Sequence, residues 1–412
     1  MQTNPDTTAE PAGHRGSANG PYYDPYDVEI DKDPYPVWKR LRDEQPLYYN
    51  EKHDFYALSR FDDVETCQKD WRRYSSSRGT LLELIKGGVE APPGTIIFED
   101  PPQHDLHRAL LTGAFTPRRI AALEPKVREY CARSLDPLVG KGGFDFIADV
   151  GAPVPMRTIG LLLGIPEADQ QAIRDRIENS LKLTGGAPAE DMSKTARSQS
   201  EIFAEYIDWR AKNPSDDIMT ELLTAEFNDV DGKRRRLSRD EVLGYVNLLA
   251  AAGNETTTRL IGWAGKLLAE HPDQRRDLVK NPRLISNAIE ELLRYESPSP
   301  VQARYVTDDA EHYGQPVKAG SVLLLLTAAA NRDERRFPDA DRFDVHRQIE
   351  RHVAFGYGVH FCLGASLARL EARVALEEVL KRFTEWQVDW EHAVQAHTST
   401  VRGWERLPVL TP

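Results

Sequence analysis

The stretch that decides the fold lies near the C-terminus and reads FGYGVHFCLG (355–364). Its cysteine, Cys362, is followed at once by LGASLARLEARVALEEVLKRF (363–383), which has a strongly helical pattern. The thiol therefore stands at a predicted helix N-terminus, where free backbone N–H groups and the helix dipole stabilise a thiolate. The upstream glycines permit a tight turn that brings the backbone close to a flat ligand. A buried structural cysteine is the alternative.

The neighbours of the cysteine form the pattern F-x-x-G-x-[HR]-x-C-x-G, which resembles the haem-binding loop of the cytochromes P-450. The resemblance implies that Cys362 is the axial iron ligand of haem b, and thiolate ligation favours O–O bond cleavage. It also implies that Phe355 packs near the sulfur, that Gly358 permits the turn and that Gly364 lets the helix approach the porphyrin. By the same resemblance His360 faces a haem propionate, although a solvated loop histidine is the alternative.

One long helix is predicted over residues 239–270. Ser238 and Glu241 have capping-box spacing at its start, and Pro272 ends the pattern. A helix of this length is roughly 48 Å long and can cross a whole domain. Within it, AAGNETTT (251–258) places a glycine and a polar run inside an apolar helix. Threonines there can bond back to a carbonyl four residues earlier and locally open the helix.

The same stretch resembles the [AG]-G-x-[DE]-T-[TS] motif of the family. The resemblance implies that Glu255 and Thr256 form an acid–alcohol pair, which can relay protons to bound dioxygen. It implies further that Ala252 and Gly253 shape the oxygen pocket and bind the cofactor, with Thr257 as a supporting hydroxyl. The alternative is a helix kink that carries ordinary polar side chains.

The segment EELLR (290–294) offers two ion pairs to Arg294, because Glu290 and Glu291 both lie one helical turn away. Helix geometry does not choose between them, and an exposed pair is common. Resemblance to the E-x-x-R motif of the family implies that Glu291 pairs with Arg294 behind the haem. Arg342, in FPDADRF (337–343), is implied as the third partner of this structural cluster.

Two further segments supply cations for the haem propionates, which as buried anions need them. EDPPQHDLHRALLTGAFTPRR (99–119) resembles the D-P-P-x-H-x-x-x-R pattern and implies His104 and Arg108. ARYVTDDAEHYG (303–314) resembles the R-x-x-T-x-D-x-E pattern and implies Arg304. Solvated surface positions are the alternative for each of these residues.

Composition bounds the organisation of the chain. The polar start (1–20) predicts a disordered tail without a signal peptide or anchor, and no apolar run is long enough for a membrane span. A net charge of −12 argues against general nucleic-acid binding.

Strand-like stretches are confined to 46–60, 303–313 and 321–327. We expect a single domain (21–412) of the mainly α P-450 fold, with one small β-rich region and haem between the long central helix and the cysteine-loop helix.

The resemblance runs from residue 33 to the C-terminus. It implies a cytoplasmic, monomeric haem-thiolate monooxygenase that inserts one oxygen atom from O2 into a hydrophobic organic substrate. Because the chain lacks a cysteine set for an iron–sulfur cluster, electrons are expected from a separate ferredoxin and its reductase. Candidates for a basic docking face are Arg108, Arg118, Arg119, Arg369 and Arg373. A peroxide-using peroxygenase and a non-enzymatic haem-thiolate sensor are the rivals, and the acid–alcohol pair argues against both.

The substrate is not defined by the sequence. Leu248, Ala252 and Thr256 recur every four residues, so one stripe of the long helix is expected to face haem and substrate. The candidate pocket residues are Leu81, Leu84, Ile97, Asn247, Leu248, Ala251, Val301 and Gln302. They suggest an apolar cavity, but the leucines could equally belong to the core. Asn247 and Gln302 could orient a substrate or cap backbone. Lipid, steroid, terpenoid and aromatic substrates all fit.

Overall fold

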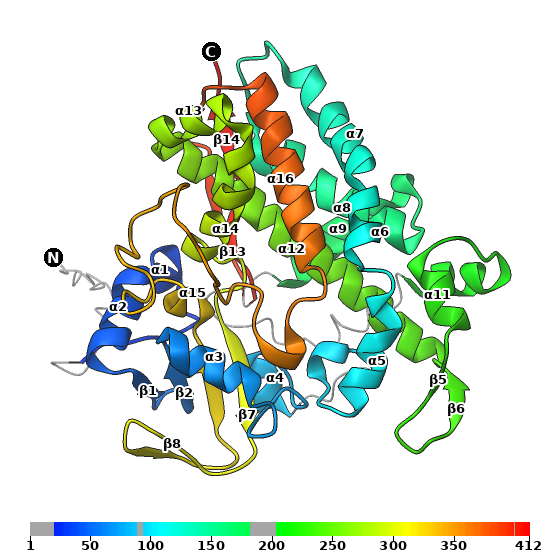
Figure 1. The fold of residues 1–412 in the computed structure, drawn as a ribbon, viewed down its shortest axis with the longest axis vertical. Helices are drawn as coiled ribbons and strands as arrows, with labels where there is room; N and C mark the ends of the chain where they lie inside the picture. The colour runs from blue at the N-terminus through cyan, green and yellow to red at the C-terminus, as the bar shows by residue number, and fades with distance from the viewer. Residues whose placement is uncertain (1–19, 89–93, 182–202, 399) are drawn as a thin grey trace, which may run out of the picture.

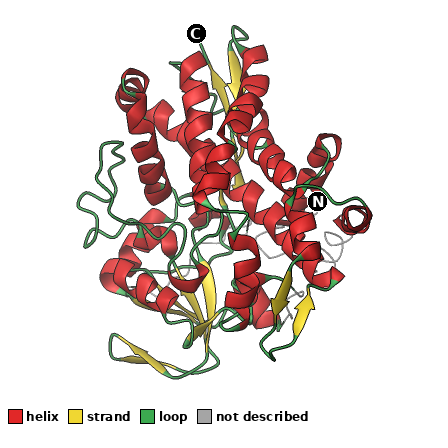
Figure 2. Cartoon of the chain, turned by 45° about the vertical axis from the view of Figure 1, so that its right-hand side comes forward, coloured by secondary structure: helices red, strands yellow, loops and turns green. Residues whose placement is uncertain are grey.

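The computed structural model describes residues 20–88, 94–181, 203–398 and 400–412, and the side chains of 176–181 are not described. The predicted N-terminal tail therefore lies outside the described residues, apart from Gly20. Helices dominate the chain, and short strands gather in a few places, as Figure 2 shows. This architecture is the mainly α fold that the sequence predicts.

Fifteen named helices appear among the described residues, and residues 203–212 are also helical. The named helices are α1 (Val28–Lys32), α2 (Tyr35–Glu44), α3 (Phe61–Lys69), α4 (Leu82–Gly87), α5 (Gln103–Thr112), α6 (Pro117–Ala122), α7 (Glu124–Leu135), α8 (Pro153–Leu163), α9 (Glu167–Leu181), α11 (Ile218–Thr224), α12 (Arg239–Glu270), α13 (Pro272–Lys280), α14 (Ile285–Tyr295), α15 (Thr327–Ala330) and α16 (Ala365–Arg382).

The long helix α12 runs over the predicted residues, 239–270. Its capping box is present, because the Ser238 side chain accepts from the backbone N–H of Glu241 and the Glu241 carboxylate accepts from the Ser238 N–H. Most of its side chains between these ends are buried, and it crosses the molecule behind α16 (Figure 1). Local capping signals were therefore sufficient to define both ends of this helix.

Asn281 and Pro282 are residue types that favour the N-cap and the first position of a helix, but α14 does not begin there. Residues Pro282–Leu284 form a 3-10 turn, and the Asn281 side chain makes no cap hydrogen bond. The Leu284 N–H instead donates to the Asn281 carbonyl oxygen at 3.0 Å, a bond across three residues. The α-helix proper begins at Ile285 and ends at Tyr295, three residues before Pro298.

A five-stranded sheet of order β1-β2-β10-β7-β3 forms the predicted β-rich region. Three of its four strand pairs are antiparallel, and β2 pairs with β10 in parallel. Of the strands in the four smaller sheets, β8 lies within the predicted strand-like stretch 303–313 and the others lie outside the predicted stretches; most of them have only two or three residues and leave little periodic signal. The strands are β1 (Leu47–Asn50), β2 (Phe55–Leu58), β3 (Tyr74–Ser75), β4 (Gly143–Asp145), β5 (Glu226–Asn228), β6 (Arg234–Arg236), β7 (Gln302–Val306), β8 (Ala310–His312), β9 (Gln315–Val317), β10 (Val322–Leu325), β11 (Gln387–Val388), β12 (Val394–His397), β13 (Arg402–Arg406) and β14 (Pro408–Leu410).

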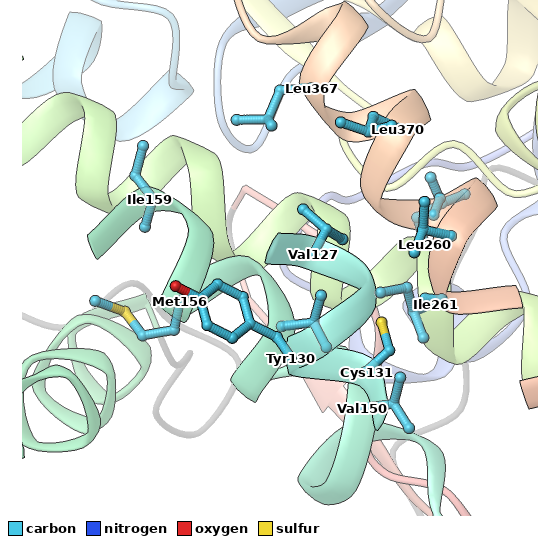
Figure 3. Close-up of a cluster of buried hydrophobic side chains, with 14 of the residues drawn as sticks. Val127, Tyr130, Cys131, Val150, Met156, Ile159, Leu260, Ile261, Leu367 and Leu370 are labelled. Carbon is cyan, nitrogen blue, oxygen red and sulfur yellow. The ribbon is translucent and has the colours of Figure 1, made fainter. Parts of the chain in front are cut away.

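The main apolar core lies where α7, α8, α12 and α16 meet. Val127, Ile159, Leu260 and Leu370 represent the four helices in this cluster (Figure 3). Burying each such side chain stabilises the fold by about 1.5–3 kcal/mol. The cluster therefore holds α16, and with it the preceding cysteine loop, firmly against α12.

One segment of the described chain, residues 146–163, is long and apolar enough to span a membrane. It comprises a π-helical turn (Phe146–Gly151) followed by α8, and 67% of it is buried inside the fold. We therefore interpret it as a core helix.

Candidate active site

The cysteine loop is shaped by its glycines and by two backbone hydrogen bonds. The Cys362 N–H donates to the Phe355 carbonyl oxygen at 2.9 Å, and the Ala365 N–H donates to the Cys362 carbonyl oxygen at 3.3 Å. Gly358 has a φ of 75°, and a Cβ there would lie 2.6 Å from the backbone oxygen of Gln68. Only glycine suits that position, as the predicted turn requires. A Cβ on Gly364 would meet only the Cys362 sulfur within 4.0 Å among the described residues, so this side of the loop is open.

The thiol of Cys362 is exposed, whereas Cys67 and Cys131 are buried. Burial raises the pKa of Cys67 and of Cys131 to about 12, so both are inert thiols. Burial also raises the pKa of Cys362, but the Gly364 N–H and the guanidinium groups of Arg108 and Arg369 act in the opposite direction. An accessible sulfur that is nonetheless surrounded by protein lies in a recess, where it can bind a metal ion carried by a cofactor.

A single accessible stripe runs along α12, which is otherwise buried across the middle of the protein. Between residues 243 and 265 its partly or fully accessible members are Leu243, Asn247, Leu248, Ala251, Ala252, Gly253 and Thr256. Partly buried Leu248 and Ala251 border the same core cluster as Phe355 and Leu363 of the cysteine loop. The stripe and the loop therefore both pack on the main core, and α16 lies alongside α12 in Figure 1.

The predicted acid and alcohol on α12 point in different directions. The Thr256 hydroxyl belongs to the accessible stripe and donates to the Ala252 carbonyl oxygen at 2.9 Å. Glu255 is buried, and its carboxylate lies 2.8 Å from the guanidinium of Arg259, which also donates to the Trp404 carbonyl oxygen. The carboxylate is therefore held in an ion pair on the core side of the helix.

Gly253 differs from its predicted role in the pocket. A Cβ at this position would lie 3.3 Å from Cδ1 of Ile159 on α8, tighter than an ordinary van der Waals contact. Its missing side chain therefore permits close packing of α8 on α12. The small side chain of Ala252, which is exposed on the accessible stripe, leaves the space that was expected from both residues.

Four basic side chains gather beside the cysteine loop, as the motifs predict: His104, Arg108, Arg304 and His360. The rings of His104 and His360 lie 4.4 Å apart between centroids, and Nε2 of each is buried without a hydrogen-bond partner in the described structure. Burial and the nearby Arg304, His104 and Arg108 lower the pKa of His360 to about 3. Burial lowers the pKa of Arg304 to about 10. The two arginines thus supply the positive charge of this cluster at neutral pH, and the two imidazoles each offer an unpartnered ring nitrogen.

The hydrogen-bond acceptors that contact this cluster are mostly neutral oxygens. Arg304 donates to the Ala303 carbonyl oxygen and to Gln302 Oε1, and Arg108 donates to the Phe361 carbonyl oxygen at 2.5 Å. Asp105 accepts from His104 Nδ1 at 3.0 Å. A group of two guanidiniums and two unpartnered imidazole nitrogens fits a ligand that carries two carboxylates, and the two haem propionates meet this requirement. The residues present therefore fit haem.

The ion pair behind the site joins Glu291 to Arg294 at 2.6 Å, and both side chains are fully buried. The predicted third partner, Arg342, is wrong, because its side chain is 69% exposed and only its carbonyl oxygen contacts Arg294. Arg347 takes this place, with Nε 3.3 Å from the Glu291 carboxylate. Glu290, the alternative acid, instead pairs with Arg369 at 2.6 Å.

The candidate pocket residues are only partly brought together. Leu81 and Val301 line one cavity of about 60 Å³. Leu84 is half-buried, and Ile97 is exposed. The two polar candidates bond to the protein: Asn247 donates to the Leu243 carbonyl oxygen at 2.9 Å, and Gln302 accepts from Arg304.

Three residues of the site region were not predicted from the sequence: Arg259, Arg347 and Glu371. Arg259 lies four residues after Glu255, so the ion pair had a local signal. Glu371 lies four residues after Leu367 on the apolar face of α16, which predicts burial. Arg347 lies in a loop and had no local signal that linked it to Glu291.

Comparison with known proteins agrees with this geometry. The family profile described as Cytochrome P-450 matches residues 175–400. Over 392 residues the chain is 39% identical to a protein described as cytochrome P-450 123 from Mycobacterium tuberculosis, covering 94% of this chain and 96% of the relative. It is 35% identical over 384 residues to a vitamin D(3) 25-hydroxylase from Pseudonocardia autotrophica, with 92% and 94% covered.

Solved structures show the same relationship. A cytochrome P-450 from Chondromyces apiculatus is 35% identical, with a TM-score of 0.83 and 94% and 98% of the two chains covered. One from Bacillus megaterium in complex with testosterone is 29% identical, with a TM-score of 0.84 and 93% and 99% covered. These matches span nearly the whole chain, and the recessed cysteine and basic cluster fit the cofactor of that family. The chain belongs to the cytochrome P-450 family and is a monooxygenase that binds haem b through an axial cysteine thiolate.

Proposed function

We propose that this P-450 is cytoplasmic and uses O2, with electrons from a ferredoxin and its reductase, to hydroxylate a hydrophobic small molecule. Two observations carry the proposal: the accessible thiol of Cys362, and the accessible stripe of α12 that holds small residues and a hydroxyl. Family membership implies a redox partner and a hydrophobic substrate in general. The identity of both belongs to this proposal.

In the mechanism, haem b supplies dioxygen binding and O–O bond cleavage when it is bound with thiolate ligation. Cys362 provides the sulfur, and the N–H of Gly364 together with Arg108 stabilises its negative charge. The cluster of His104, Arg304 and His360 holds the carboxylates of the cofactor. Ala251 and Ala252 leave room for dioxygen and substrate on the side of α12.

Protons are handled by Thr256 and Glu255 in this proposal. The Thr256 hydroxyl donates to the Ala252 carbonyl oxygen, so its lone pairs remain available to accept a proton on the cavity side. The Glu255 carboxylate must leave Arg259 before it can exchange a proton with the cavity. Separating a buried ion pair is expensive, so delivery by this route depends on a rearrangement of the pair.

Electron transfer requires a docking face near the cysteine loop. Of the candidate arginines, Arg369 pairs with Glu290 at 2.6 Å, Arg373 with Glu124 at 2.5 Å and Arg119 with Glu221 at 2.5 Å. These acids reduce the local positive charge, whereas Arg118 is exposed. An acidic ferredoxin would therefore bind by modest electrostatic attraction, and its binding should weaken with salt.

The substrate is proposed to be apolar and rigid. The candidate walls are aliphatic, and relatives include a vitamin D(3) hydroxylase and a structure in complex with testosterone. Because Asn247 and Gln302 bond to the protein itself, the pocket offers few dedicated polar anchors from these positions. Sterols and terpenoids fit such a surface better than strongly polar compounds.

An optical titration tests the proposal. Ferric holoenzyme is titrated with sterols, terpenoids, fatty acids and small aromatics while the Soret band is followed. A saturable shift from low to high spin with a sterol or terpenoid, followed by a hydroxylated product with ferredoxin, reductase and O2, is expected. Product with hydrogen peroxide but none with the ferredoxin system would identify a peroxygenase. Absence of product with either system would favour a sensor and overturn the proposal.

A further inference from the structure

Phe355, at the start of the cysteine loop, is contacted by two side chains that share one acid. The guanidinium of Arg369 on α16 lies over the Phe355 ring, 4.5 Å from its centroid. The imidazole ring of His352 lies 5.9 Å from the same ring between centroids. Both side chains contact the carboxylate of Glu290 on α14, at 2.6 Å from Arg369 and 3.1 Å from His352. Arg369, Glu290 and His352 therefore form one unit beside Phe355, the Glu290 cluster.

The hydrogen bonds of His352 determine where its proton lies. The Ala354 N–H donates to Nδ1 of His352 at 3.2 Å, so this nitrogen is an acceptor and carries no proton. The proton is therefore on Nε2, which donates to the Glu290 carboxylate. His352 is thus a neutral member of the Glu290 cluster and adds no charge to it.

The other two members of the cluster carry opposite charges. Burial opposes the ionisation of Glu290, but its hydrogen bonds to Arg369 and His352 lower its pKa to about 2. Arg369 binds this carboxylate through two donors, with Nε at 2.6 Å and Nη2 at 2.9 Å. Glu290 is therefore the counter-ion that compensates the charge of Arg369.

The cluster is connected to the cysteine in two ways. The Phe355 carbonyl oxygen accepts the Cys362 N–H at 2.9 Å, so Phe355 also fixes the backbone of the cysteine. Burial raises the pKa of the Cys362 thiol, and the Gly364 N–H, Arg108 and Arg369 oppose this rise. The charge of Arg369 therefore acts on the sulfur. Arg369 bonds a carboxylate, whereas Arg108 bonds the carbonyl oxygen of the loop.

A charge that acts on the sulfur also acts on an iron that the sulfur binds. Reduction adds one electron to the haem, so a nearby cation favours the reduced state and a nearby anion opposes it. We propose that Glu290 sets the reduction potential of the bound haem, because it compensates the charge of Arg369 and positions this guanidinium on Phe355. Loss of the Arg369 charge should therefore lower the potential, and loss of the Glu290 charge should raise it.

An isosteric replacement separates the charge of Glu290 from its shape. In Glu290→Gln the amide oxygen can still accept a hydrogen bond from Arg369, and the Phe355 ring still supports the guanidinium. A purely structural role would give Glu290→Gln and Arg369→Gln potential shifts of the same sign, because each substitution loosens the same contact. Shifts of opposite sign are expected only if the two charges themselves act on the haem.

The test is a reductive titration of the holoenzymes with dithionite and redox mediators, followed through the Soret band. Arg369→Gln should shift the equilibrium about tenfold toward the ferric state, which lowers the potential by about 59 mV for a one-electron couple. Glu290→Gln should shift it about three- to tenfold toward the ferrous state. The double variant should lie between the two single variants. Arg369→Lys keeps the charge and should stay within about twofold of wild type.

A neighbouring ion pair provides the matched control. Arg373 lies one turn further along α16 and bonds Glu124 at 2.5 Å. It is not among the groups that act on the Cys362 thiol. Glu124→Gln removes the same charge from a similar pair and should shift the equilibrium by less than about twofold.

The outcomes decide between a charge effect and a structural one. Shifts of the same sign in Glu290→Gln and Arg369→Gln, or a Glu124→Gln shift as large as that of Glu290→Gln, would overturn the proposed role. If Glu290→Gln does not retain haem, an unchanged potential in Arg369→Gln, or equal potentials in Arg369→Gln and Arg369→Lys, would overturn it. The titration uses neither substrate nor ferredoxin, so these potentials are measurable even if the proposed substrate and electron donor are wrong.

Discussion

The replacement Glu371→Gln should make the protein more stable, and the gain should grow with pH. The folded-state pKa of Glu371 is raised to about 8 from an ordinary value of 4.5. Between these values the folded protein binds a proton that the unfolded chain has lost, so stability falls as pH rises through this window. Glutamine has nearly the same shape, does not titrate and presents a similarly unpartnered polar group.

The magnitude follows from the size of the shift. Each pKa unit corresponds to about 1.4 kcal/mol. Keeping the carboxyl in the fold therefore costs roughly 3 kcal/mol at pH 7 and roughly 5 kcal/mol above pH 8, and almost nothing near pH 4.5. Glu371→Gln should raise the free energy of unfolding by about these amounts.

Urea unfolding of the holoenzymes at pH 5, 6, 7 and 8, followed by far-ultraviolet circular dichroism, measures this difference. At constant m-value, the change in midpoint reports the change in stability. A difference between Glu371→Gln and wild type that stays flat from pH 5 to 8 would refute the reasoning, because a neutral buried acid must produce a slope.

Glu378→Gln is the matched control on the same helix. Burial tends to raise the pKa of Glu378, but its bonds to Arg382 and Arg128 bring about a net lowering. The stability that Glu378 contributes is therefore present above its unfolded pKa and lost as pH falls through its folded pKa. Glu378→Gln should destabilise the protein at pH 7, by about 1–3 kcal/mol. Two substitutions of buried glutamates in one helix should thus have opposite signs.

Three further predictions concern the cofactor and its support. Cys362→Ser should abolish the thiolate-type Soret band of the carbon monoxide complex, whereas Cys131→Ser should keep it. Glu291→Gln should lower the free energy of unfolding by about 3–5 kcal/mol, because this substitution leaves a buried arginine without its carboxylate. Arg342→Leu replaces an exposed side chain and should change the free energy of unfolding by less than about 0.5 kcal/mol in denaturant titrations. Arg304→Leu should weaken haem binding about tenfold in reconstitution titrations. The same substitution should stabilise the apoprotein against urea, because it removes a buried cation.

Sequence reasoning succeeded where the signal was local. The capping box of Ser238 and Glu241, with Pro272 beyond, defined the 32 residues of α12 correctly. The cysteine loop was recognisable because its glycines and helix start lie within ten residues of one another. These features depend on neighbours along the chain, so the order of residues carries them.

Sequence reasoning failed where partners come from distant segments. Arg342 and Arg347 are five residues apart in one loop, and only the path of that loop brings Arg347 to Glu291. Helical periodicity predicts that Glu371 is buried, but it does not reveal that no arginine reaches it, as one reaches Glu378. The presence or absence of a partner for a buried charge is a tertiary property.

Among the described residues, the cations around Arg304 and the carboxyl of Glu371 are both buried without full compensation, and they differ in what relieves them. The cations around Arg304 gain carboxylate partners when the cofactor binds, so their cost appears mainly in the apoprotein and links folding to haem binding. Glu371 faces only hydroxyls, a neutral thiol and apolar side chains, so cofactor binding leaves its cost in place. This cost persists in the working enzyme. Glu371→Gln should therefore stabilise the holoenzyme, whereas Arg304→Leu should stabilise the apoprotein and weaken cofactor binding.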